Sequence, residues 1–388
     1  MKQETIQYRG YNDFKCTADK CRHTCCMGWQ INIDDKTYKK YEDSTYLKKD
    51  MSLNFIKGRN EEEGDIISMK LTKDGFCTFL QKDFLCELHS KCGEDFLCDT
   101  CRIYPRGINV VGKVIEKHLY SSCPAMVEGF LLNNDKLTFE MLENDYDKEE
   151  IDKTIEFESE IEEQLFKEIR GFTIEALQSD YISFEEKFIV IGLAYSNFDP
   201  LMTNREFEEV RRLIAIYTEM IEDSSIIPQM EATSMHNEIK TVVLDEISKF
   251  NLEGKLEEIL VNLLNVLDES ANGIDGKFKE KYDLYEKNNS VYIQNYLVNA
   301  VYSSGTPFTS YEVMDSYTLL VIKYMIFKTY MKAVKEDIIT DENFVDIVAL
   351  SSRSFDHNKM GVDVLISELQ ILSKISGDVV GVLVNLIR

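Results

Sequence analysis

Every cysteine of this chain lies in its first third, and this clustering limits the possible folds more than any other feature of the sequence. Ten of the 388 residues are cysteines, and none occurs after residue 123. They are Cys16, Cys21, Cys25, Cys26, Cys77, Cys86, Cys92, Cys98, Cys101 and Cys123. A random scatter would not give this distribution, so we expect the thiols to serve one local purpose.

Disulfides, inert buried thiols and metal ligation are the ordinary explanations for many cysteines. Disulfides need an oxidising compartment, but no apolar stretch of a secretory signal follows Met1. The adjacent Cys25 and Cys26 would also pair only with strain. Inert thiols need no clustering. We therefore predict that soft thiolates bind metal, either zinc or an iron–sulfur cluster.

The spacing of the cysteines leaves the type of metal centre open. Cys98 and Cys101 are separated by two residues, and Cys21 and Cys25 by three, so each pair can hold one centre from a single turn. Eight to ten thiols suit two four-ligand sites, or one cluster with spare cysteines. Zinc ribbons usually have two C-x2-C pairs, and only Cys98/Cys101 has that form. The C-x3-C-x2-C triad of radical enzymes is missing because Cys26 directly follows Cys25.

Other residues near the cysteines are candidates for supporting roles. His23, His89 and His118 are each expected to be ordinary polar residues more often than ligands. The guanidinium groups of Arg102 and Arg106 are suited to offset thiolate charge or to hold a carboxylate. We expect the single tryptophan to pack over the metal module.

The charge of the chain argues against one class of partner. The net charge is −25, and the acidic excess lies after Cys123. Such a surface repels nucleic acid phosphates. It favours a basic partner, such as a lysine-bearing substrate, or serves solubility alone.

The most apolar run, Leu319–Ile322, is followed by Lys323 and Lys328. It is too short for a membrane span, so we expect a soluble cytoplasmic protein.

Residues 1–125 are predicted to mix short elements with loops, and residues 126–388 to form an acidic α-helical domain. A β-hairpin is predicted from two strands, Ile108–Val111 and Val114–Tyr120, joined by a turn at Gly112-Lys113. This hairpin would return Cys123 to the earlier cysteines. Thr37–Lys49 predicts a helix. The predicted fold is mainly α, with a small irregular α+β cysteine-rich metal module packed on a larger α-helical region.

Three capping boxes predict helix starts in the second region. They pair Ser183 with Glu186, Thr203 with Glu206, and Thr309 with Glu312. The helix containing Leu319 to Met331 is apolar nearly all round, so we expect it at the centre of the bundle. The acidic stretch Glu140–Glu163 is expected to be a solvated helical face or a connector. Pro200, Pro228 and Pro307 are expected at junctions between elements.

The cysteines and their neighbours together resemble one known family. The motifs are Cys16, Cys21, Cys25-Cys26-x-Gly28-Trp29-Gln30-Ile31, Cys77-Thr78-Phe79-Leu80, Cys86-x-Leu88-His89, Gly93-Glu94, Cys98-x-Thr100-Cys101-Arg102-x-Tyr104-Pro105-Arg106 and Ser122-Cys123-Pro124. They look like the flagellin lysine N-methylase family, and the cysteine part is similar to the zinc- or iron-chelating eight-cysteine domains. In that broader pattern the matching ligands are Cys16, Cys21, Cys25, Cys26, Cys77, Cys86, Cys101 and Cys123. Cys98 is an addition shared with some methylases, and Cys92 has no counterpart.

The resemblance implies transfer of a methyl group from S-adenosylmethionine to flagellin lysines, with a [4Fe–4S] cluster. It rests on residues 16–124, and no sharp motif follows them. The open alternatives are a non-catalytic zinc or iron–sulfur module and a redox or electron-transfer protein.

The cofactor and catalytic residues are less strongly indicated. No G-x-G occurs among the 18 glycines, so the Gly-rich loop that commonly binds nucleotide cofactors is absent from the sequence. One hypothesis is that an open iron of the cluster takes the amine and carboxylate of S-adenosylmethionine. Arg102 and Arg106 are candidates for contacting it. Free lysine has a pKa near ~10.4, so the site must lower that pKa or accept the proton. Tyr104, the tyrosine nearest to the motif, is the catalytic candidate.

Overall fold

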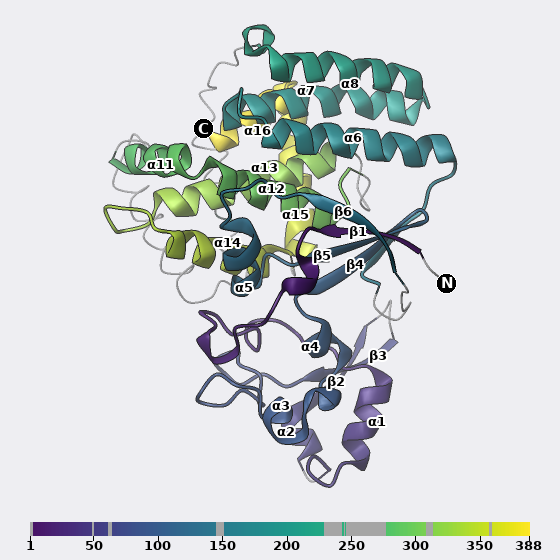
Figure 1. The fold of residues 1–388 in the computed structure, drawn as a ribbon, viewed down its shortest axis with the longest axis vertical. Coiled ribbons are helices and arrows are strands. Elements are labelled where there is room, and N and C mark those ends of the chain that lie inside the picture. The colour runs from purple at the N-terminus through teal and green to yellow at the C-terminus, as the bar shows by residue number, and fades with distance from the viewer. Residues whose placement is uncertain are drawn as a thin grey trace.

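The computed structural model contains a sheet covered by helices and, beside it, a smaller group of short elements (Figure 1). It describes residues 3–48, 50–60, 64–144, 151–228, 243, 245, 277–307, 313–356 and 359–388. The strands are β1 (Gln3–Tyr8), β2 (Phe55–Asn60), β3 (Gly64–Met69), β4 (Arg106–Val111), β5 (Val114–Leu119), β6 (Phe139–Asn144) and β7 (Lys153–Ile155). The helices are α1 (Asp35–Asp43), α2 (Met51–Asn54), α3 (Glu87–Cys92), α4 (Asp99–Ile103), α5 (Pro124–Met126), α6 (Glu160–Gln178), α7 (Phe184–Thr203), α8 (Phe207–Glu222), α11 (Lys277–Asn288), α12 (Ser290–Ser304), α13 (Val313–Lys332), α14 (Asp341–Asp356), α15 (Lys359–Ser376) and α16 (Val379–Ile387). The prediction of a mainly helical chain is confirmed.

The larger sheet has the strand order β6-β1-β5-β4-β7. Strands β4 and β5 form the predicted hairpin, with Val111 opposite Val114 and a two-residue turn at Gly112-Lys113. Gly112 has φ +58°, and two-residue hairpin turns favour a positive φ at their first residue. Strand β1 pairs in parallel with β5 and antiparallel with β6. The hairpin prediction is confirmed.

The acidic stretch Glu140–Glu163 was expected to be helical or a connector, and this is wrong for two parts of it. Residues 139–144 form edge strand β6 along β1, and residues 153–155 form β7 along β4. Phe139 contacts Tyr302 with ring centroids 4.4 Å apart. Partial burial of the Phe139 side chain against α12 thus favours a strand despite the acidic neighbours. Strands β6 and β7 follow residue 125, yet they pair with strands β1 and β4, which precede it. The predicted domain boundary between residues 125 and 126 stays a prediction.

Helix α13 lies at the centre of the helical region, as predicted from its apolar sequence. Nearly all of its described side chains are buried, and it packs against α7, α14 and α16. Gly192 allows α7 and α13 to approach closely, because a Cβ at Gly192 would lie 2.5 Å from the hydroxyl of Tyr317. That hydroxyl donates to the carbonyl of Phe188 at 2.8 Å.

The predicted helix starts had mixed outcomes. Ser183 and Glu186 form a capping box at the start of α7, as predicted. The Thr203 box is wrong: Thr203 is still within α7, and its hydroxyl donates to the carbonyl of Asp199 at 3.0 Å. Helix α8 begins at Phe207 without a side-chain cap. The Thr309 box lies outside the described residues. Pro200 is inside α7 rather than at a junction.

The helix predicted over Thr37–Lys49 is shorter and begins earlier. Asp34 accepts a hydrogen bond from the Thr37 backbone amide at 2.8 Å, so α1 starts at Asp35. It ends at Asp43, where Ser44 turns to an extended conformation.

Two separate hydrophobic cores are present among the described residues. The larger joins the helices to the sheet. The smaller is formed by residues from Ile31 to Cys98, including Tyr41, Phe55 and Phe79. The elements around it form the lower group in Figure 1. No helix in the described part of the chain is both long and apolar enough to cross a membrane.

Lys187 gives the helical core a pH dependence. Its ammonium donates to the carbonyl of Leu177 at 2.8 Å and lies 4.4 Å from the ring centre of Phe184. Burial lowers its pKa from 10.5 to about 8. Between about pH 8 and 10.5 the unfolded chain therefore holds a proton that the folded chain releases, and stability rises with pH.

Relative to Lys187→Met, the wild type should gain about 2–3 kcal/mol of unfolding free energy across that pH window. Urea unfolding of both proteins at the two ends of the window measures this gain, since other titrating groups cancel in the difference. A difference that does not change with pH would refute the assignment.

Candidate functional site

Cysteines from distant parts of the sequence meet around one cavity of about 440 Å³. Seven of them line it: Cys16, Cys21, Cys25, Cys26, Cys86, Cys101 and Cys123. They come from the loop before α1, the start of α3, helix α4 and the residue before α5. Seven of the ten cysteines thus share one cavity, and the purpose that they serve stays a prediction.

Cys77 and Cys98 do not line the cavity but are buried in the smaller hydrophobic core. Cys98 immediately precedes α4, and Cys101 lies within it. A hydrogen bond from Cys101 lowers the pKa of Cys98. This C-x2-C pair therefore has one thiol that ionises more readily than the other. Cys92, which the motifs left out of the ligand set, ends α3 and is not among the lining residues.

Cys25 lies among the other thiols of the cavity. Burial raises the pKa of Cys21, Cys86 and Cys123, and the charge of Cys25 adds to that rise. A hydrogen bond with Cys98 is the main cause of the raised pKa of Cys101, and Cys25 adds to it. A hydrogen bond with its neighbour Cys26 raises the pKa of Cys25 itself well above the usual value. Most of these thiols thus hold their protons without a metal, whereas a bound metal cation deprotonates a coordinating thiol.

Seven thiols around one cavity form a soft donor set, which suits either zinc or an iron–sulfur cluster. Among the described residues no three His, Cys, Asp or Glu side chains lie close enough together to hold one metal ion. A zinc ion draws four ligands to about 2.3 Å from one point, whereas the thiolates of a four-iron cluster bind separate irons. The type of metal centre therefore stays a prediction.

The predicted catalytic and cofactor residues also line this cavity. The hydroxyl of Tyr104 lies 3.0 Å from that of Ser122, and its ring centre lies 5.5 Å from that of Trp29. Burial raises the pKa of Tyr104, so its phenol stays protonated. Arg102 pairs with Asp99 at 2.6 Å.

Arg106 lies at the border of the cavity. Its guanidinium is 5.1 Å from the ring centre of Phe14 and donates to the Phe14 carbonyl at 3.3 Å. Trp29 lines the cavity, and its indole donates to the carbonyl of Cys25 at 2.6 Å.

The three histidines separate into two environments. His23 and His89 line the cavity. His118 is buried in the larger sheet on β5, and burial lowers its pKa to about 3. Its imidazole Nε2 lies 3.6 Å from a carboxylate oxygen of Asp152. His118 is therefore a neutral residue of the sheet interior, in line with the ordinary role expected for it.

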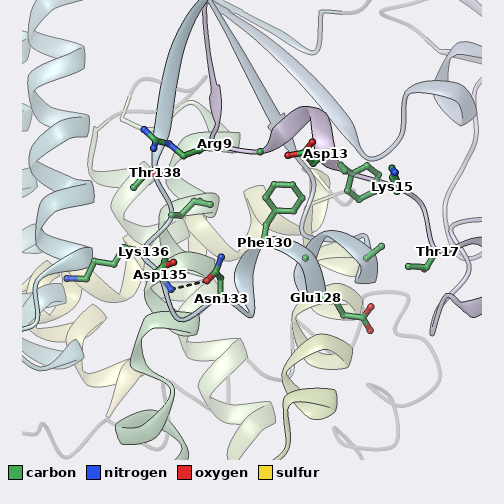
Figure 2. A pocket seen from close by; sticks show the side chains of 15 residues that line it. Arg9, Asp13, Lys15, Thr17, Glu128, Phe130, Asn133, Asp135, Lys136 and Thr138 are labelled. Carbon is green, nitrogen blue, oxygen red and sulfur yellow. Dashed lines mark hydrogen bonds between the residues drawn. The ribbon is translucent and has the colours of Figure 1, made fainter.

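Another cavity, of about 670 Å³, adjoins the first (Figure 2). Phe14 and Ala125 line both. Its walls carry three cationic and three acidic side chains, together with two aromatic rings. These are Arg9, Lys15, Lys136, Asp13, Glu128, Asp135, Phe14 and Phe130. This mixture can contact ligands of either charge, and it extends the accessible surface beside the cysteines.

Sequence reasoning missed the contribution of the helical region to the cysteine cavity. Asp346 and Arg353 of α14 contact the loop that carries Cys21 and Cys25. No motif after residue 124 marks these residues, and they lie more than 300 positions away from the loop.

The fold and the site together define a mainly helical protein with a thiol-lined cavity beside its sheet. The model of the FliB lysine N-methylase C-terminal domain matches residues 170–376, more than half of the chain. The chain therefore belongs to the FliB lysine N-methylase family, as the cysteine motifs indicated. The matched region covers α6 to α15 almost entirely, where the sequence analysis found helix caps but no motif of the family.

Curated relatives agree with this family. The lysine-N-methylases of Salmonella typhimurium and Salmonella choleraesuis are each 30% identical to the chain, over 144 and 147 residues. Each match spans 35% of this chain and only 35% of the relative. The flagellar biosynthetic protein FliU of Salmonella muenchen is 29% identical over 144 residues, which are 35% of this chain and 83% of that protein. No solved structure matches.

Proposed function

We propose that this chain is an S-adenosylmethionine-dependent protein-lysine N-methyltransferase that acts on flagellin and needs a [4Fe–4S] cluster. The observation that carries the proposal is its membership of a family whose curated members are named lysine-N-methylases. The name of FliU adds support for a flagellar substrate. The proposed ligands are drawn from the nine motif cysteines, with zinc as the alternative metal.

The residues around the cavity suit a reaction at an amine. S-adenosylmethionine, when bound, supplies the methyl group. The lysine nitrogen must lose its proton to accept that methyl group, and burial in a partly apolar cavity lowers the pKa of an amine. Tyr104 keeps its own proton because burial raises its pKa. Its role would therefore be to orient the amine by hydrogen bonding rather than to remove a proton as a phenolate.

Arg102 and Arg106 are the proposed contacts for the carboxylate of the cofactor. Both line the cysteine cavity. A guanidinium binds a carboxylate through two parallel hydrogen bonds. Arg106 is the stronger candidate, because Arg102 already pairs with Asp99.

Intact-mass analysis of flagellin co-expressed with this protein tests the proposal. Methyl-sized mass increments should appear with the wild type and with Cys92→Ala, and disappear with Cys101→Ala. Unmodified flagellin beside a folded, metal-loaded wild type would overturn flagellin as the substrate. Increments that persist with Cys101→Ala would overturn the dependence on the cysteine site.

A further inference from the structure

The loop between Cys21 and Cys25 is held by helix α14. Asp346, which is 3% exposed, accepts hydrogen bonds from Arg22 Nε at 2.9 Å and Arg22 Nη2 at 3.2 Å. The imidazole Nε2 of His23 lies 2.8 Å from the same carboxylate. One buried carboxylate of the family domain thus contacts two consecutive residues between two cysteines of the cavity.

Arg353 lies two turns further along α14, on the same face of the helix as Asp346. It is 5% exposed, and its Nη1 donates to the carbonyl of Thr24 at 2.9 Å. Its Nη2 donates to the carbonyl of Ser122 at 3.4 Å. Thr24 immediately precedes Cys25, and Ser122 immediately precedes Cys123. A single guanidinium therefore joins the backbone at two cysteines that are 98 positions apart in numbering.

The charge of Arg353 also matches what a thiolate site requires. Burying a guanidinium is unfavourable unless opposite charge lies near it. The two hydrogen bonds of Arg353 go to the residues directly before Cys25 and Cys123. Thiolates that bind metal carry the negative charge that a buried cation favours.

We propose that Asp346 and Arg353 are positioning residues of the metal site, so that the site is complete only when the helical domain contacts the cysteine loop. The proposal depends on the metal-binding part of the proposed function and not on methyl transfer. The outer partners of metal ligands orient those ligands, and replacing them typically weakens metal binding by about 10–100-fold.

The test uses the full chain purified without oxygen. We compare the wild type with Arg353→Gln, Arg353→Lys and Asp346→Asn. The control is Arg211→Gln, which breaks a partly exposed ion pair between Arg211 of α8 and Glu168 of α6. The measurements are iron and acid-labile sulfide per chain, the rate at which an iron chelator removes the metal, and the midpoint potential of the cluster.

We expect Arg353→Gln and Asp346→Asn to lose metal to the chelator about 10–100-fold faster than the wild type. Arg353→Gln should also shift the midpoint potential to more negative values, because a nearby positive charge stabilises the reduced cluster. Arg353→Lys keeps the charge but not the two-carbonyl bridge. It should therefore keep the potential near that of the wild type and still lose metal faster. Arg211→Gln should behave as the wild type.

The proposal would be overturned if Arg353→Gln and Asp346→Asn lose metal to the chelator at the wild-type rate and Arg353→Gln keeps the wild-type midpoint potential. If Arg353→Gln does not fold, Arg353→Lys and Asp346→Asn decide the question through the chelator rate. A wild type without metal would also overturn it. Flagellin methylation is assayed separately, so the positioning role and the methylase activity can fail independently.

Discussion

Replacing Cys25 with alanine should reduce the iron and sulfide of the purified chain by more than about tenfold. Cys25 lines the cavity, and its charge adds to the raised pKa of four other cysteines there, namely Cys21, Cys123, Cys86 and Cys101. Its loss removes a predicted ligand from among these thiols. Even changes to the outer partners of metal ligands weaken metal binding by about 10–100-fold, and loss of a ligand should weaken it at least as much.

Metal and sulfide analysis of anaerobically purified protein measures this effect. Cys92→Ala is the matched control, because it also removes one thiol but at a residue that does not line the cavity. It should retain the metal content of the wild type. Equal metal contents in Cys25→Ala and Cys92→Ala would place the metal elsewhere.

Replacing Glu116 with alanine should lower the free energy of unfolding by about 3–5 kcal/mol, the usual result of leaving one charge of a buried pair unpaired. Glu116 of β5 is 1% exposed and Arg170 of α6 is 7% exposed. Two hydrogen bonds join them, and the one from Nη1 to Oε2 measures 2.8 Å. The guanidinium also lies 4.6 Å from the ring centre of Phe166. It is therefore enclosed and has no ready access to water.

Denaturant unfolding of Glu116→Ala beside Glu168→Ala separates the buried pair from an ordinary one. Glu168 pairs with Arg211, and both side chains are about 30% exposed. Ion pairs with access to solvent contribute about 0–1 kcal/mol, so Glu168→Ala should change stability little. A loss below about 1 kcal/mol in Glu116→Ala would show that Arg170 finds another partner.

Local signals in the sequence were sufficient for several elements. The hairpin of β4 and β5 was predicted because its turn and strands are adjacent, and the Ser183 cap because it acts within four residues. The convergence of Tyr104, Arg102 and Arg106 on the cysteine cavity followed from their closeness to Cys101 along the chain. Such features depend on neighbours that the sequence itself places together.

Features made by distant contacts were not predicted. Strand β1 pairs with residues 115–117 and 139–144. The first segment was predicted as a strand of the hairpin, but nothing in its sequence indicates that β1 pairs with it. The hydrogen bond from Arg22 to Asp346 joins residues 324 positions apart, and no motif in α14 predicts it. The edge strand β6 was missed because its acidic residues resemble a solvated segment until Phe139 meets Tyr302. Tertiary packing determines these strands and contacts, and the periodicity of a short sequence window carries no information about tertiary packing.

The parallel pairing of β1 with β5 has a consequence for how the protein is assembled during synthesis. Residues 3–8 are synthesised before their strand partners on β5, which follow more than 100 positions later. The intervening segment carries every cysteine except Cys123. Closing so long a loop is slow compared with forming local contacts. Nine thiols therefore emerge before the pairing of β1 with β5 can form, and α14 emerges later still. Uptake of the proposed metal would then be one of the last steps in the maturation of the chain, and the nascent thiols would need protection from oxidation until then.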